Sequence, residues 1–171
     1  MSKLFFNTSF LKSKEVFPVF DENQKDIYEV KQTLKRASSY SAEVFDIGKN
    51  LVFSIDRESW ARGPKFNISF ANGSTMVFKN TPGLFKNTLV AELDGQKLRL
   101  DGNIPAFDFQ VFNEADQAIG KIDHKRDKST DHYEADIYDE NYRDPILALV
   151  ICLNNILNLD RASKLIIASS I

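Results

Sequence analysis

The segment between Asp144 and Asp160 constrains the fold of this chain more than any other part. It has no charged residue and opens with the run Pro-Ile-Leu-Ala-Leu-Val-Ile-Cys-Leu. At 100° per residue, positions 146–153 place apolar side chains on every side of a helix. Asp144 as N-cap, followed by proline at the first helical position, marks its start. Such a helix has no face for water, so protein or lipid must surround it.

The length and content of this helix favour a protein environment. Its fifteen uncharged residues span roughly 22 Å as a helix, against a hydrocarbon core of ~30 Å. Asn154, Asn155 and Asn158 would lie in lipid without obvious partners. We therefore predict a buried core helix over about residues 144–159 and no transmembrane segment, with a membrane span as the alternative.

The chain before this helix repeats one unit, which consists of a short strand, a polar turn opened by Asp or Asn, and a second strand. A period of about 19 to 26 residues between these turns marks a repeated supersecondary unit, here a β-hairpin. Glycine after Asn72 and after Asp94 suits the positive φ of tight hairpin turns. The residues that open the five turns are Asp21, Asp46, Asn72, Asp94 and Asn113. The paired strands are predicted at 16–20 and 27–31, 41–45 and 51–55, 66–70 and 74–78, 88–93 and 96–100, and 107–112 and 117–122.

Alternation within these strands gives each one an apolar and a polar face. Phe66, Ile68 and Phe70 share one side, for example, opposite Asn67 and Ser69. This period of two is typical of antiparallel strands with one dry face. Further strands are predicted over residues 3–10 and 132–138, and residues 164–168 are predicted to form a closing strand.

The predicted strands and the predicted helix constrain one another. A flat sheet covers one side of an all-apolar helix, whereas a closed sheet surrounds the helix and removes exposed edges. We predict a mostly β (α+β) fold, a closed antiparallel barrel of about twelve strands around a central hydrophobic C-terminal helix. The 171 residues fit one domain, 1–171. A lipocalin-like barrel is the competing architecture, but its helix packs outside and should be amphipathic.

Composition narrows the classes of function. The net charge of −2 gives no global basic field for nucleic acid. A single cysteine, Cys152, has no internal disulfide partner, which suits a reducing compartment. The first residues turn polar too early for a signal peptide. We expect a cytoplasmic protein, peripheral at a membrane if it binds one.

The strand–turn–strand repeat followed by a hydrophobic helix resembles the tubby C-terminal-like superfamily, in its LURP-one-related branch with bacterial relatives. The matching segments are Val19–Asn23 with Ile27–Lys31, and Tyr133–Asp136 through Asp144 into Ile146–Leu153. The resemblance covers nearly the whole chain and implies a barrel of about twelve strands around a central helix. Known members include phosphoinositide-binding tubby proteins, phospholipid scramblases and many proteins of unassigned role, and they are generally not enzymes.

The sequence contains few candidates for catalytic or metal-binding residues. There is no glycine-rich nucleotide loop, serine-nucleophile motif or paired-cysteine metal spacing. His124 and His132, with Asp123 and Asp131 beside them, suggest a metal site, but we favour two solvated histidines on either side of a polar turn over residues 125–131. The apolar neighbours of Cys152 favour an inert core thiol over a nucleophile. We expect no catalytic residue, metal or cofactor.

Two further groups have alternative interpretations. The acidic stretch 136–144 suggests calcium, but its spacing does not match an EF-hand loop, and helix capping with solvation is favoured. Trp60, Phe85 and Phe107 are expected in the core or at a barrel end. Contact of Trp60 with a membrane interface, beside two arginines, is the alternative.

Basic residues gather in two places and are the candidates for binding anionic phospholipid. Each lysine or arginine near a membrane contributes ~1 kcal/mol. Asp123, Asp127 and Asp131 interleave with the second group and dilute its field, so a solvated loop is the competing interpretation. The first group is Lys31, Lys35 and Arg36, and the second is Lys121, Lys125, Arg126 and Lys128.

The leading hypothesis is a non-catalytic intracellular binding or scaffold protein, with anionic phospholipid or another protein as its partner. Scramblase-like lipid movement is a second hypothesis, which requires the helix to reach lipid. A third is a barrel with a small-molecule pocket at one end, as an enzyme or a ligand carrier.

Overall fold

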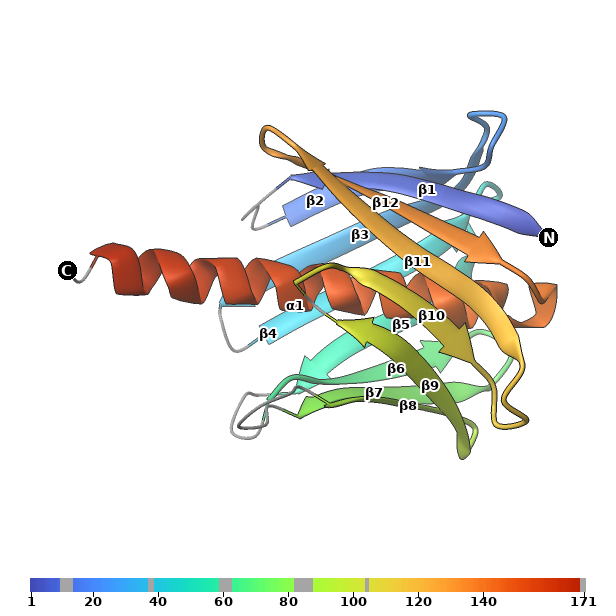
Figure 1. The fold of residues 1–171 in the computed structure, drawn as a ribbon. Helices are drawn as coiled ribbons and strands as arrows, with labels where there is room; N and C mark the ends of the chain where they lie inside the picture. Colours follow the sequence, from blue (N-terminus) through green and yellow to red (C-terminus); the bar gives the residue numbers. More distant parts are fainter. Residues whose placement is uncertain (10–13, 37–38, 59–62, 82–87, 104, 170–171) are drawn as a thin grey trace.

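The computed structural model describes residues 1–9, 14–36, 39–58, 63–81, 88–103 and 105–169 (Figure 1). Within these ranges the chain forms twelve strands, one turn of 3-10 helix and one α-helix. The strands are β1 (Ser2–Ser9), β2 (Lys14–Phe20), β3 (Asp26–Arg36), β4 (Ser39–Asp46), β5 (Leu51–Glu58), β6 (Lys65–Phe70), β7 (Thr75–Thr81), β8 (Thr88–Leu93), β9 (Gln96–Asn103), β10 (Asp108–Phe112), β11 (Ala118–Asp127) and β12 (Thr130–Ile137). The 3-10 turn η1 (Glu140–Tyr142) leads into α1 (Arg143–Ser169).

The strands form a closed antiparallel barrel, as predicted. Each strand pairs with its neighbours in the chain, and β1 pairs with β12 to close the wall. The closing register runs from Ser2 opposite Ile137 to Ser9 opposite Thr130. The described strands are thus joined in one continuous ring, which leaves no outermost strand edge open to another chain.

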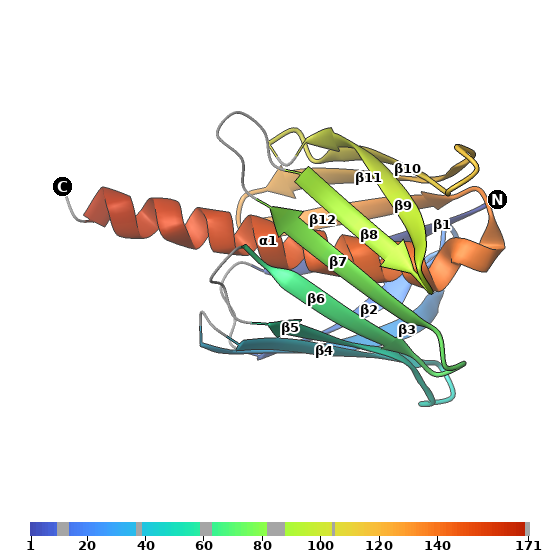
Figure 2. The same cartoon turned by 90° about the horizontal axis from the view of Figure 1, so that it is seen from below.

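Helix α1 runs through the barrel, with strands on every side of it (Figures 1 and 2). Every residue from Ile146 to Leu153 is fully buried. The inward strand positions that surround it are also buried, including Phe53, Phe66 and Phe109 at 0% exposure. The many phenylalanines fill the space between a narrow helix and a wide wall, a space that smaller side chains would leave as voids.

The repeated Asp and Asn residues open turns by a shared hydrogen bond. In three turns the Oδ1 atom accepts a bond from the backbone N–H four residues later, at 2.9–3.0 Å. The residue before that donor adopts a positive φ of 62–66°. The hairpin at Asp94-Gly95 is tighter, with both residues at positive φ. The three turns of shared geometry open at Asp21, Asp46 and Asn113.

The predicted helix boundaries and closing strand were wrong. Helix α1 begins one residue earlier, at Arg143, so Asp144 lies in its first turn and not at the N-cap. The helix also continues to Ser169, and residues 164–168 are helical instead of a strand. Because β1 already occupies the free edge of β12, this segment has no strand edge to pair with. A continuing helix satisfies its backbone groups internally.

Among the described helices, α1 has the length and hydrophobicity that a membrane span needs. However, 67% of the 18-residue apolar window within Glu140–Lys164 is buried inside the protein. Core helices of soluble proteins pass the same test of length and composition. In this fold the barrel wall surrounds the helix, as predicted from the uncharged apolar run.

Leu149→Asp tests the central position of the helix. Leu149 is fully buried, and an unpaired carboxyl group there costs several kcal/mol, which is comparable with the ~5–15 kcal/mol stability of a typical domain. We expect no cooperatively melting protein in thermal unfolding followed by circular dichroism. The matched control Val16→Asp, at a strand position with 61% exposure, should fold. A soluble Leu149→Asp variant that melts cooperatively would contradict this placement.

Gly120→Ala tests the close contact of β11 with the start of α1. A Cβ atom at Gly120 would lie 2.6 Å from Ile146 Cδ1 and 2.6 Å from the Asp136 carbonyl oxygen. We expect a loss of about 1–3 kcal/mol in urea unfolding, because β11 must move away from the Asp136 carbonyl of β12 and from the Ile146 side chain to admit the methyl group. Gln110→Ala, on the outer face of the neighbouring strand, is the control and should change stability little. Equal stability of both variants would mean that the helix shifts without cost.

Candidate functional site: a polar cluster and a basic hairpin where the helix leaves the barrel

The two ends of the barrel differ in what they carry. At the helix-start end, η1 and the first turn of α1 lie beside the β2–β3, β4–β5, β6–β7, β8–β9 and β10–β11 turns (Figure 1). At the helix-exit end, α1 extends beyond the wall, and the β11–β12 turn lies there (Figures 1 and 2). The predicted lipid candidates at 125–128 and 35–36 are strand-end or turn residues at this helix-exit end.

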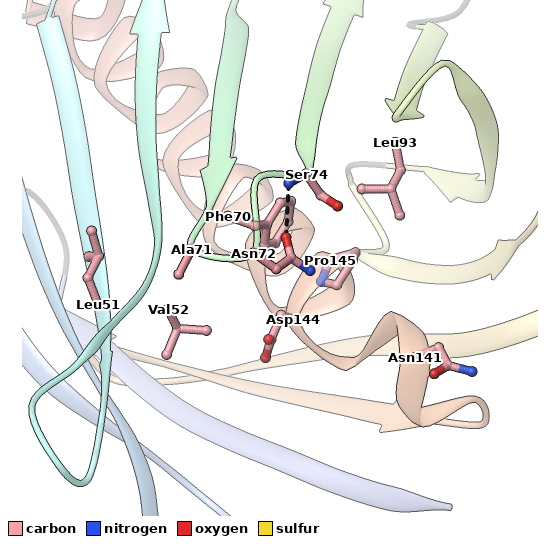
Figure 3. A pocket seen from close by; sticks show the side chains of 10 residues that line it. All are labelled: Leu51, Val52, Phe70, Ala71, Asn72, Ser74, Leu93, Asn141, Asp144 and Pro145. Atoms are coloured by element: carbon pink, nitrogen blue, oxygen red, sulfur yellow. Dashed lines mark hydrogen bonds between the residues drawn. The ribbon is translucent and has the colours of Figure 1, made fainter.

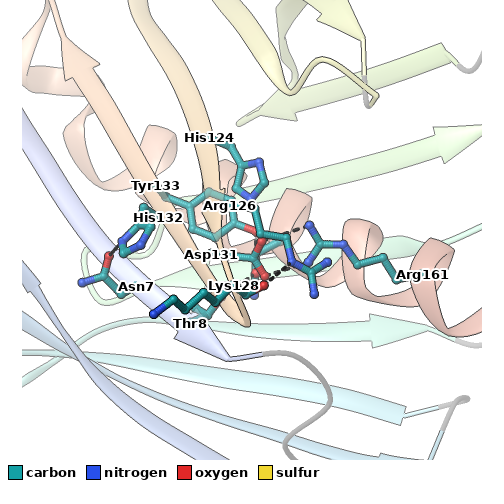
Figure 4. Close-up of polar contacts among 10 residues, drawn as sticks. Asn7, Thr8, His124, Arg126, Lys128, Asp131, His132, Tyr133 and Arg161 are labelled. Atoms are coloured by element: carbon teal, nitrogen blue, oxygen red, sulfur yellow. Dashed lines mark hydrogen bonds and ion pairs between the residues drawn. The ribbon is translucent and has the colours of Figure 1, made fainter.

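A buried carboxylate organises the helix-exit end. Asp131 of β12 is fully buried and contacts both β11 and α1 (Figure 4). Arg161 of the helix donates two hydrogen bonds to it, from Nη1 to Oδ2 at 2.7 Å and from Nη2 to Oδ1 at 2.9 Å. His124 Nε2 lies 2.7 Å from the same Oδ1. The bidentate arginine pair fixes the angle at which the helix leaves the barrel.

The partners of Asp131 set its protonation. Burial alone would raise the pKa, but the hydrogen bonds from His124 and Arg161 and the positive charge of Arg161 outweigh burial and lower the pKa to about 2. Asp131 therefore stays ionised at any pH above about 3. Its charge is neutralised inside the protein and contributes little to the field outside.

Asn154 and Asn155 of the helix face polar partners on the wall, whereas Asn158 Oδ1 is buried with no hydrogen-bond partner among the described residues. Asn154 Oδ1 accepts hydrogen bonds from Thr8 Oγ1 at 3.0 Å and from the Tyr133 hydroxyl at 2.6 Å. Asn155 Oδ1 accepts one from Arg57 Nη1 at 2.6 Å. The barrel thus supplies hydrogen bonds that lipid would not, which explains how polar residues lie within an otherwise apolar helix.

The second basic group lies on a β-hairpin and not in a loop. The predicted polar turn 125–131 was wrong, because β11 extends to Asp127 and β12 begins at Thr130. Only Lys128 and Ser129 form the turn, and Lys128 adopts a positive φ of 54°. Lys125, Arg126 and Lys128 are all exposed. We call this segment, residues 125–130, the basic hairpin.

The other predicted lipid candidates differ in their surroundings. Lys121 points outward at mid-strand and lies 3.3 Å from Asp123, whose hydrogen bond raises the lysine pKa. Lys31 lies 3.7 Å from Glu29 and over the ring of Phe45. Both charges are therefore largely compensated on the wall. Lys35 and Arg36 end β3, and their side chains lie outside the described residues.

The structure brings the two basic groups to one end but not into contact. Strands β2, β1 and β12 separate β3 from β11, a distance of roughly 19 Å along the wall at ~4.8 Å per strand. Lys14, at the start of β2, is exposed between them. Lys164 of α1 is exposed at the same end. Sequence reasoning missed both lysines, because only the barrel order places β2 and the helix exit beside the basic hairpin.

The predicted pair of solvated histidines was wrong for His124. The β11–β12 register places His124 beside Tyr133 on the inner face, where its side chain is 11% exposed. His132 is exposed on the outer face and pairs through Nδ1 with Asn7 Oδ1 (Figure 4). The two rings lie on opposite sides of the wall and cannot bind one metal ion.

The remaining candidate residues from the sequence have structural roles in this fold. Cys152 is buried, and burial raises the pKa of its thiol well above the ordinary value. In the acidic stretch, Asp139 Oδ1 accepts the Asn141 N–H and caps η1, while Asp144 accepts the Tyr28 hydroxyl. Phe107 is buried, as expected for a core residue. Trp60 and Phe85 lie outside the described residues.

The helix-start end has the opposite charge. All of its turns are described, and they contain many more carboxylates than cations. The carboxylates are Asp21, Glu22, Asp94, Glu114, Asp116, Asp139 and Glu140, and the cations are Lys25 and Lys49. Arg99 compensates Asp116, and Arg143 compensates Glu140. The other five carboxylates still outnumber the two lysines, so the small net charge of −2 hides an acidic end opposite the basic hairpin.

Asp131→Asn tests the buried ion cluster by its pH dependence. Because the folded pKa of about 2 lies below the ordinary 3.8, the carboxylate stabilises the fold above about pH 4, and this contribution disappears as pH falls toward 2. We expect urea unfolding at pH 7 to show a loss of about 2 kcal/mol or more, and this loss to shrink below pH 4. Asp127→Asn, exposed on the same hairpin, is the control. A loss that does not change with pH would contradict the assignment.

The similarity of this chain to known proteins is at the level of a protein family. No curated protein gives a significant match to the chain. A crystal structure of a protein from Arabidopsis thaliana is similar, with 14% sequence identity, a TM-score of 0.49, and 89% of this chain and 91% of that chain covered. The model of the LURP-one-related family matches residues 2–154, which include all twelve strands and the first part of α1. The chain belongs to the LURP-one-related family.

Proposed function

We propose that this protein is a non-catalytic binding barrel that attaches to anionic phospholipid surfaces with its helix-exit end. The observation that carries the proposal is the separation of charge along the barrel axis. The basic hairpin and Lys14 lie at one end, and the acidic turns lie at the other. Lys164, also at the basic end, is paired with Asp160 at 3.0 Å and adds little. An anionic surface attracts the first end and repels the second, so the molecule is oriented as it approaches.

Tertiary contacts strengthen the field of the basic hairpin. Two of the three carboxylates that interleave with it in sequence are compensated locally. Asp131 is buried against Arg161, and Asp123 is paired with Lys121. Asp127 is left as the exposed acidic neighbour of Lys125, Arg126 and Lys128. The hairpin tip is therefore more positive than its sequence suggests.

The chemistry of the described residues supports binding over catalysis. Among them, no three His, Cys, Asp or Glu side chains gather as metal ligands do. Cys152 has a raised pKa and lies in the core, which suits a structural thiol and not a nucleophile. His124 is held between aromatic rings, with centroids 4.9 Å from those of Phe107 and Tyr133.

Co-sedimentation with phosphatidylserine vesicles at low salt tests this function. Replacing Lys125, Arg126 and Lys128 together with Gln removes about 3 kcal/mol of attraction at ~1 kcal/mol per cation, so we expect about 100-fold weaker binding. High salt should also release the unchanged protein.

The matched control replaces Lys25, Lys49 and Lys97 with Gln, which changes the net charge equally at the helix-start end. This control should bind as well as the unchanged protein or better. No binding of the unchanged protein at low salt, or equal loss in both triple variants, would refute the proposal.

A further inference from the structure

A pocket lies at the helix-start end, between the first turn of α1 and the strand ends of β5 to β8. Its volume is about 320 Å³, within the range of small-molecule sites. Figure 3 shows the side chains that line it, with Asp144 and Pro145 on the helix side and Leu51 and Val52 on the wall. The described residues place this pocket at the end of the barrel opposite the basic hairpin.

The lining combines apolar walls with one charge. Leu51, Val52, Phe70, Leu93 and Pro145 supply aliphatic and aromatic surface. The remaining lining residues are Ala71, Asn72, Ser74, Asn141 and Asp144, and of these ten only Asp144 is charged.

Asp144 is held in place with one oxygen available. The Tyr28 hydroxyl donates to Oδ1 at 2.7 Å. Within the described residues, no donor reaches the second oxygen, Oδ2. Asn72 Oδ1 is also fixed, because it accepts the Ser74 N–H at 2.9 Å (Figure 3). The carboxylate is therefore preorganised beside the pocket instead of being mobile on the surface.

The electrostatic field around the pocket favours a cation. The N-terminus of α1 contributes about half a positive charge, which the full charge of Asp144 outweighs. Arg143 stacks over the Tyr28 ring at 5.7 Å, and its charge is offset by Glu140, 3.9 Å away. Asp94 and Asp139 add negative charge at the same end of the barrel. An anionic ligand would meet repulsion here, and a neutral one would leave a partly desolvated carboxylate unpaired.

We propose that this pocket binds a primary alkylammonium group, with Asp144 as the counter-ion and the apolar walls around the carbon chain. A free alkylamine and a lysine side chain share this chemistry. The inference is independent of phospholipid binding, because the pocket and the basic hairpin lie at opposite ends of the barrel.

Titration with n-pentylamine, followed by NMR of the backbone amides of Ser74 and Asn141, tests the site. We expect saturable shifts with a Kd on the order of 1 mM, the affinity expected for a ligand of this size. Pentan-1-ol, which keeps the chain without the charge, should bind at least 10-fold more weakly. Asp144→Asn keeps an acceptor for Tyr28 and should weaken pentylamine binding at least 10-fold. The control Glu114→Gln removes an exposed charge at the same end and should change Kd by less than twofold.

A blocked peptide with one central lysine separates the two sources of the ligand. Shifts at Ser74 and Asn141 with both probes assign the site to lysine side chains, and shifts with pentylamine alone assign it to free amines. Equal affinity for pentylamine and pentan-1-ol, or an unchanged Kd in Asp144→Asn, would overturn the proposal. Circular dichroism of the variant confirms that its fold is retained.

Discussion

The structure depends on one constraint, which is that α1 has no side that tolerates water through its first half. Every residue from Ile146 to Leu153 is fully buried, so the wall must surround the helix completely. Closure of β1 onto β12 meets this requirement and satisfies the backbone groups of both strands at once. The barrel and the helix are therefore interdependent, because the wall without the helix would enclose a cavity and the helix without the wall would be insoluble.

In the second half of the helix, buried hydrogen bonds to the wall are added to the apolar packing. Asn154, Asn155 and Arg161 bond to three strands of the wall: Asn154 to β1 and β12, Asn155 to β5, and Arg161 to β12. Apolar contacts alone allow a helix to rotate or slide at small cost, since they are not directional. Buried hydrogen bonds and the bidentate pair to Asp131 penalise such movement, because each displaced polar group would lose its partner.

This arrangement separates two surfaces of different charge. Pairing within the protein compensates Asp131 and Asp123, which leaves the cations of the hairpin tip outside. At the opposite end the turns that open the hairpins use Asp side chains, since these accept backbone hydrogen bonds in tight turns. The acidity of that end is therefore partly a by-product of turn formation. The same acidic residues supply a negative electrostatic field around the pocket that Asp144 borders.

The period of the hairpins, the alternation in their strands and the continuous apolar run were visible in the sequence, because they depend on local geometry and on burial. They determined the strands, most of the turn residues, the central helix and the closed barrel. The end of the helix was not determined locally, because Lys164–Ala168 suits a strand as well as a helix and only the occupied edge of β12 excludes the strand. The same holds for the site. Strand register decides which face of the wall His124 occupies. Contacts between residues distant in the chain decide which carboxylates are neutralised and place Asp144 beside a pocket with Phe70 and Leu93. Such contacts leave no periodic pattern in one sequence.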